Sequence, residues 1–189
     1  MNIQTLLPYL VVAVVVILAA LGIMYAITRI KSQQLRKKFG PEYDYTLQKE
    51  GDPKKAEQSL VEREKRVTHL DIHPLDENTR DRYNEEWMEI QAFFVDDPKK
   101  AVDQANRLIT EVMIARGFPV ADFEQRAADL SVLYPEFVPN YRNAYAIAMK
   151  NQEDGSSTEE LRQAMVYYHS LFGELLGPVQ IKEKELETA

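Results

Sequence analysis

The sequence LLPYLVVAVVVILAALGIMYAIT, from Leu6 to Thr28, runs for 23 residues without a charged side chain. As a helix rising about 1.5 Å per residue it would be about 34 Å long, enough to cross a hydrocarbon core of about 30 Å. A cleaved signal peptide is the alternative, but residues 1–5 hold no Lys or Arg and the apolar run is longer than such peptides use. The stretch therefore predicts a retained transmembrane helix at residues 6–28.

Basic side chains follow this stretch, with no acidic residue before Glu42. They are Arg29, Lys31, Arg36, Lys37 and Lys38. The flank that carries Lys and Arg usually faces the cytoplasm, so the N-terminus is expected outside and the rest of the chain inside. The five cations are either only this topology signal or also membrane-surface contacts, drawn to anionic lipid head groups of the bilayer.

The remainder of the chain is acidic and contains no cysteine. Without the five cations, 18 basic side chains stand against 30 acidic ones, a net charge of −12. Nucleic acid is an improbable partner for such a chain, because phosphates require a basic face. The lack of cysteine excludes disulfides and thiol catalysis, and it is compatible with a reducing cytoplasm.

Helix start and stop signals divide the chain after the span into short helices, and no segment alternates as a strand does. A basic juxtamembrane extension at 29–40 ends at Gly40-Pro41, an all-α domain follows at 41–177, and 178–189 is expected to be a flexible tail. The fold class is thus all-α, a transmembrane helix followed by a compact bundle of about six helices. The expected helical segments are 41–49, 53–68, 78–94, 98–116, 122–131, 138–151 and 157–176.

Apolar stripes at helical spacing predict which faces form the core. Tyr83, Trp87, Ile90 and Phe94 form one stripe, and the helix at 98–116 carries another, so these two helices should pack as an antiparallel hairpin. The last helix has the most regular stripe, and Ser157 with Glu160 has the spacing of a capping box at its start.

No catalytic or metal-binding arrangement is recognisable. His69 and His73, with Asp71, could offer metal ligands only on a helix, which Pro74 ends, so an exposed polar link is expected there. His169 is interpreted as a histidine at the edge of the core. The sequence has no glycine-rich phosphate loop, and no cofactor is expected.

Carboxylates in the helix at 78–94 are interpreted as a solvated face. Glu85, Glu86 and Glu89 lie away from Trp87 on a helical projection, which argues against an acid/base pair. An enzyme is therefore not expected.

The segment from Asp122 to Ser131 combines four charged residues with two alanines. Arg126 could brace its own helix through Asp122, which lies four residues earlier. It could also be buried against the helix at 138–151. In a third interpretation, Arg126 and Asp129 form a face that binds a partner protein.

Several segments resemble a family of small bacterial single-span membrane proteins of unknown function: Lys38–Asp44, Phe94–Pro98, Asp122–Ser131 and Ser157–Met165. The resemblance covers most of residues 35–176. It implies the bacterial inner membrane as location and carries no activity, ligand or catalytic residue.

The function expected from the sequence is that of an adaptor or scaffold. A bitopic protein would present a cytoplasmic all-α domain that binds another protein. Two other classes of function remain open. One is a structural module that assembles with itself as a homo-oligomer in the membrane, and the other is an unrecognised enzyme subunit.

Overall fold

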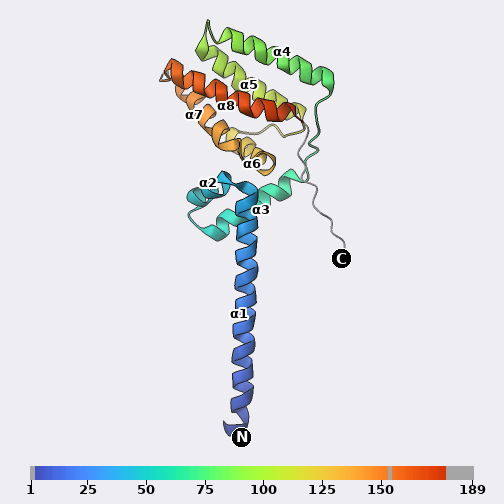
Figure 1. Ribbon diagram of the computed structural model, residues 1–189, viewed down its shortest axis with the longest axis vertical. Helices are drawn as coiled ribbons and strands as arrows, with labels where there is room; N and C mark the ends of the chain where they lie inside the picture. The colour runs from blue at the N-terminus through green and yellow to red at the C-terminus, as the bar shows by residue number, and fades with distance from the viewer. Residues whose placement is uncertain (1–2, 153–154, 178–189) are drawn as a thin grey trace. The chain divides into compact units, whose positions relative to one another are not determined.

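The computed structural model describes residues 3–152 and 155–177, with side chains from residue 16 onward. These residues form eight helices and no strand, which confirms the all-α class (Figure 1). The expected tail at 178–189, like residues 1–2, lies outside the described residues. The chain divides into two compact units, Met1–Lys38 and Phe39–Ala189, which are considered separately below.

The first unit is the single helix α1, Ile3–Phe39, whose last residue already belongs to the second unit. From Val16 to Ile30 its large apolar side chains are all exposed, and because they include neighbours such as Val16, Ile17 and Leu18 they cover every side of the helix. Thr28 donates its hydroxyl to the carbonyl oxygens of Met24 and Tyr25, so it needs no water. The helix is long and apolar enough to span a membrane.

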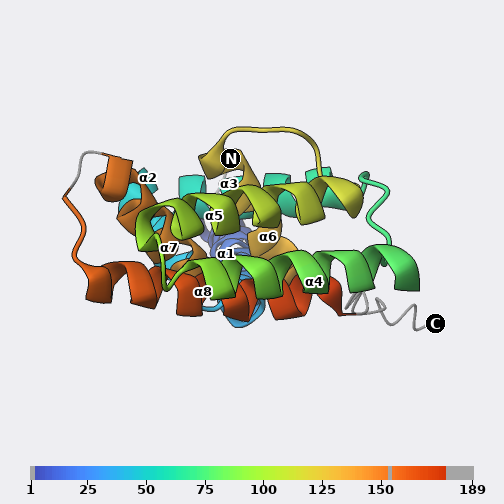
Figure 2. The ribbon, with the colours of Figure 1, turned by 90° about the horizontal axis from the view of Figure 1, so that it is seen from above.

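The second unit contains seven helices in its described part, one for each expected helical segment and roughly consistent with a bundle of about six. Their bounds are α2 Pro41–Glu50, α3 Pro53–Val67, α4 Glu77–Phe93, α5 Pro98–Ala115, α6 Phe123–Leu133, α7 Val138–Gln152 and α8 Thr158–Leu176. Figures 1 and 2 show α4 and α5 side by side as the expected hairpin, with α8 and α7 packed on α5. The hairpin of α2 and α3 packs on α6 and α7 instead.

Aspartates begin four of these helices. Asp52, Asp76, Asp97 and Asp122 each accept a hydrogen bond from the backbone N–H three residues later, which satisfies one of the free donors at the helix start. Three of these caps follow the sequence signals. Asp76 does not, because α4 was expected to start at Asn78 or Thr79. The predicted capping box of Ser157 and Glu160 is present at α8.

The main apolar core is built by α4 to α8. The stripes predicted for these helices point inward, with Trp87 only 3 % exposed. Its ring stacks on Phe172, with ring centroids 4.8 Å apart, and on His169 at 5.3 Å. His169 is exposed on its other side and therefore lies at the edge of the core, as expected. No residue of α2 or α3 belongs to this core cluster.

A buried arginine closes the end of α8. Arg116, fully buried just after α5, donates through Nη1 to the carbonyl oxygen of Leu175 in the last turn of α8. A cation at a helix C-terminus is favourable because the free carbonyl groups carry partial negative charge. Burial lowers the pKa of the Arg116 guanidinium, although the nearby Tyr134 opposes this effect.

The link between α3 and α4 crosses the end of α5 next to this arginine. The backbone N–H of His73 donates to the carbonyl oxygen of Arg116 at 3.0 Å. Gly117, with φ of +93°, allows the close approach, because a Cβ atom there would lie 2.1 Å from the backbone oxygen of Asp71. The extended link that Pro74 predicted is thus present, and α5 holds it in place.

A fragment of residues 39–177 is expected to fold without α1. The main core is formed by α4 to α8 with the links between them and the link before α4, and no residue of α1 belongs to it, so removing the apolar helix should leave it intact. The fragment should be soluble and helical, with one cooperative urea transition and blue-shifted Trp87 fluorescence. Circular dichroism and fluorescence check this, and a fragment with no cooperative transition would contradict it.

Candidate functional site

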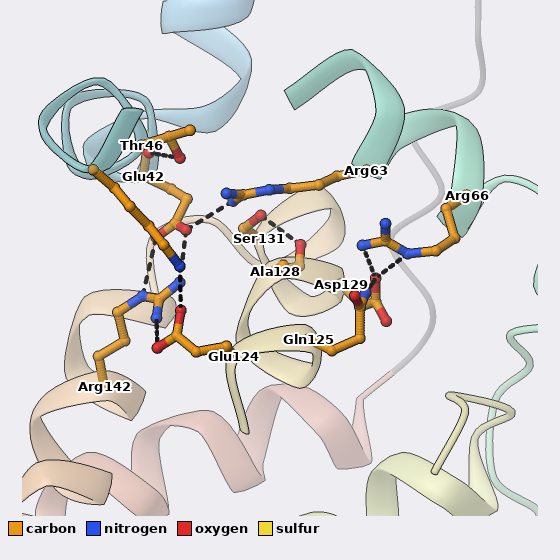
Figure 3. A network of polar contacts seen from close by, with 11 residues as sticks. Glu42, Thr46, Arg63, Arg66, Glu124, Gln125, Ala128, Asp129, Ser131 and Arg142 are labelled. Carbon is orange, nitrogen blue, oxygen red and sulfur yellow. Dashed lines mark hydrogen bonds and ion pairs between the residues drawn. The ribbon is translucent and has the colours of Figure 1, made fainter. Parts of the chain in front are cut away.

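A network of charged side chains joins four helices of the second unit (Figure 3). Its centre is the Glu42 carboxylate in α2, which is 1 % exposed. Arg63 of α3 donates to it through Nη1 at 2.9 Å, and Arg142 of α7 donates through Nη2, also at 2.9 Å. One buried anion therefore holds two cations from two other helices.

Local structure supplies the reason for each position. Glu42 lies in the first turn of α2, where the free backbone N–H groups favour a negative charge. The Arg142 guanidinium stacks over the Tyr45 ring, 4.0 Å from its centroid. Burial acts to lower the Arg142 pKa, but the hydrogen bonds and charge of Glu42 outweigh it, so the pKa is raised.

The network continues toward the surface through Glu124 of α6. This carboxylate accepts from Nη1 of Arg142 and from Nζ of Lys49, both at 3.0 Å. Burial acts to raise its pKa, but the bonds and charges of Lys49 and Arg142 lower it overall. Half of the Glu124 side chain is exposed, so this outer pair contributes little compared with the buried contacts.

The two residues proposed as a partner face, Arg126 and Asp129, bond within the domain. Asp129 is 1 % exposed and accepts from Arg66 of α3, at 2.6 Å from Nη2, and from Gln125 at 2.8 Å (Figure 3). Arg126 is half-buried and donates to the carbonyl oxygen of Ala121 at 2.7 Å and to the Tyr141 hydroxyl at 3.3 Å. The contact with Tyr141 agrees with the interpretation that Arg126 lies against the helix at 138–151, whereas Asp122, its partner in the brace interpretation, caps α6.

The network fastens helices together. Its buried acids each bond at least one arginine from another helix, so their charge is already compensated. A partner protein would have to break these pairs before it could use Glu42 or Asp129. An interaction surface is therefore to be sought elsewhere in the domain.

A half-open pocket of about 380 Å³ lies between α4 and α5. It is called the α4–α5 pocket below. Two turns of each helix line it, with Glu86, Glu89, Ile90 and Phe93 from α4 and Gln104, Arg107, Leu108 and Glu111 from α5.

The charged side chains of this pocket differ from those of the network. Within the described residues, Glu86, Glu89, Arg107 and Glu111 form no ion pair and no side-chain hydrogen bond. Burial raises the pKa of Glu86, and repulsion from Glu111 adds to the rise, whereas Arg82 opposes it. The pocket thus gathers three carboxylates and one guanidinium that form no hydrogen bond or ion pair among the described residues, although the charge of Arg82 acts on Glu86 and that of Arg107 acts on Asp103.

The solvated face expected at 85–89 is correct only in part. Glu85 and Glu89 are exposed and Glu86 is half-buried, and both Glu86 and Glu89 line the α4–α5 pocket. Helical projection could not separate them, because the wall that makes the pocket belongs to α5.

Other residues singled out in the sequence lie on open surface. Arg29, Lys31, Arg36, Lys37 and Lys38 are all exposed on the last turns of α1. His69 and His73 are exposed, and their Nδ1 atoms lie near the carbonyl oxygens of Lys65 and Pro74. Within the described part of the chain, no three His, Asp or Glu side chains are grouped to hold a metal ion.

Comparison of the chain with protein-family models, with curated proteins and with solved structures finds no match. Functional inference therefore starts from the geometry of the chain itself.

Glu42→Gln is expected to destabilise the fragment 39–177 strongly. The substitution removes the anion between Arg63 and Arg142. It leaves the buried Arg63 uncompensated and leaves Arg142 with only the half-exposed Glu124, which together costs about 3–5 kcal/mol. Urea unfolding followed by Trp87 fluorescence measures the loss.

Two further variants test the cause of that loss. Glu124→Gln, at the half-exposed end of the network, should cost less than about 1 kcal/mol. Replacing the whole triad by Glu42→Leu, Arg63→Met and Arg142→Met should recover most of the stability, because no buried charge then remains unpaired. A Glu42→Gln loss as small as that of Glu124→Gln would contradict this account.

Proposed function

We propose that this chain is a bitopic membrane protein whose α-helical domain binds another protein through the α4–α5 pocket. The observation that carries the proposal is the set of unpaired charged side chains in the pocket, in a domain whose buried acids are paired. The proposed role is that of an adaptor or scaffold at the membrane.

The anchor in this proposal is α1. A helix that exposes apolar side chains on every side is unstable in water and stable in lipid, where its backbone groups are bonded internally. The cations at 29–38 follow the apolar stretch and favour the cytoplasmic side for the domain. The proposed location is the bacterial inner membrane, with the N-terminus outside.

Protein binding suits the shape and polarity of the pocket. Its volume lies near the lower end of the range for ligand pockets, roughly 300–1,000 Å³. It is half-open and lies between the antiparallel helices α4 and α5, so it resembles a short groove in which side chains of a partner could lie. Unpaired charges at such a surface are free to bond a partner without first losing internal contacts.

The same pocket supports a second function, acid/base catalysis. Two carboxylates that repel each other, one of them with a raised pKa, are a pattern that general acids show in enzymes. Binding is the better-supported proposal because Glu89 and Glu111 are exposed and the lining offers no hydroxyl, imidazole or amine to act as a nucleophile.

The orientation predicts a protease result. In intact spheroplasts, externally added protease should leave residues 41–189 uncut, because the domain lies on the cytoplasmic side. Cleavage should appear only after the spheroplasts are lysed. Cleavage within 41–189 before lysis would place the domain on the outer side and overturn the orientation.

The binding surface predicts a position-dependent cross-link. A photoreactive benzoylphenylalanine at Gln104, in the pocket, should link a second protein in native membranes. The same group at Met88, which is 59 % exposed on α4 and does not line the pocket, is the control. An adduct from position 104 alone supports the proposal, and one with the mass of two copies indicates self-assembly. Adducts at equal yield from both positions, or none from position 104, would argue against a partner in the pocket.

A further inference from the structure

We infer that the partner inserts a segment into the α4–α5 pocket, an inference that rests on the proposed function. The Arg or Lys side chain of this segment lies between Glu86 and Glu111, and its apolar side chain lies toward Phe93. The α4–α5 pocket then determines which partner is selected. The inference combines the order of residues along the pocket with the sign of its unpaired charges.

The two ends of the pocket differ in chemistry. Glu86 on α4 and Glu111 on α5 both line the pocket, and the charge of Glu111 acts on Glu86 against the opposing effect of Arg82, which puts the two carboxylates at one end of the pocket. Because the helices are antiparallel, seven residues forward on α4 and seven back on α5 lead to the same opposite end, which Phe93 and Gln104 line. Seven residues of helix correspond to about 10 Å. An acidic end and an uncharged end with an aromatic ring are therefore about two turns apart.

The acidic end favours a cation. Glu86, Glu89 and Glu111 outnumber the single Arg107, which leaves a net charge of −2 in the pocket. A guanidinium can donate to two carboxylates at once, and its charge relieves the repulsion between Glu86 and Glu111. An anionic side chain at the same point would add to that repulsion. Charge complementarity thus selects Arg or Lys at this end.

A protein segment fits the pocket better than an isolated cation does. A lone cation would satisfy only the acidic end and leave the Phe93 end in contact with water. A segment that carries both groups about 10 Å apart covers both ends, as a helix with its cationic and apolar residues at i and i+7 does. The occupant is therefore a segment that is cationic at one end and apolar at the other.

Peptide binding to the full chain tests this inference. The chain is placed in nanodiscs of phosphatidylcholine, a lipid without net charge, so that basic peptides are not drawn to the bilayer. The probe is an alanine-based helical peptide with Arg at position 4 and Leu at position 11, measured by calorimetry at low salt. Matched peptides carry Gln in place of Arg, or Ala in place of Leu.

The Arg/Leu peptide should bind, and each matched peptide should bind about tenfold more weakly, the loss expected for a charged hydrogen bond or an apolar contact. Glu86→Gln and Glu111→Gln should each weaken the Arg/Leu peptide by about tenfold, whereas Glu85→Gln, outside the pocket, should not. Circular dichroism should show the same helix content in all three variants, because none of these carboxylates is paired.

Three results would overturn the inference. They are equal affinity for the Arg and Gln peptides, no binding of the Arg/Leu peptide at millimolar concentration, and equal affinity of arginine amide and the Arg/Leu peptide, which would indicate a small cationic ligand. The Gln104 cross-link tests the proposed function separately. A cross-link without peptide selectivity would keep protein binding and reject only the stated chemistry of the partner.

Discussion

The buried carboxylate of Glu42 is the contact on which the position of the α2–α3 hairpin depends. The hairpin shares no residue with the main core cluster, so apolar packing in that cluster does not hold it. Glu42 instead bonds Arg63 within the hairpin and Arg142 on α7, and Arg66 bonds Asp129 on α6. Burying these charges is costly, and the cost is recovered only while every partner is present. Such a joint tolerates few alternative positions, because a shift of the hairpin by one helical turn would separate the charges. The hairpin and the bundle accordingly belong to the same compact unit.

Charged side chains serve two purposes in this domain, and their pairing distinguishes them. In the network, acids and arginines from different helices neutralise each other, so their electrostatic attraction stabilises the folded domain. In the α4–α5 pocket, Glu86, Glu89, Arg107 and Glu111 form no ion pair or side-chain hydrogen bond among the described residues. Burial and the charge of Glu111 raise the pKa of Glu86, with Arg82 opposing them, so repulsion between the two carboxylates acts at that end of the pocket. A cationic partner reverses this repulsion on binding, which is the physical basis of the proposed selectivity.

Local signals predicted the helices well, because capping aspartates, prolines and apolar stripes act within a few residues. They could not show which charges are buried. Arg63 lies on the inner stripe of α3 between Leu60 and Val67, and Glu42 lies beside Tyr43 on the inner face of α2, so opposite charges on two apolar stripes were the available signal. The pocket had no such signal, because it depends on how α4 and α5 are aligned. Arg116 is a similar case, since its partners belong to α8, about 60 residues later. No local signal indicated the bond between Asp129 and Arg66, because that contact joins two helices distant in the sequence.

A membrane anchor gives a pocket of this kind an advantage that affinity alone does not. The proposed contact consists of one cation and one apolar side chain in a half-open pocket. The surface area that it buries is far smaller than that of a stable protein interface, which needs about 1,200 Å² or more. Its intrinsic affinity for a partner is therefore weak. Partners tethered to one bilayer meet at an effective concentration that short tethers raise to about millimolar, which makes weak contacts sufficient. Screening at physiological salt, with a Debye length of about 8 Å, limits the attraction of the acidic pocket to nearby cations. In the proposed function, the anchor would bring the partner close, and the carboxylates of the pocket would then select among the proteins that the membrane has already concentrated.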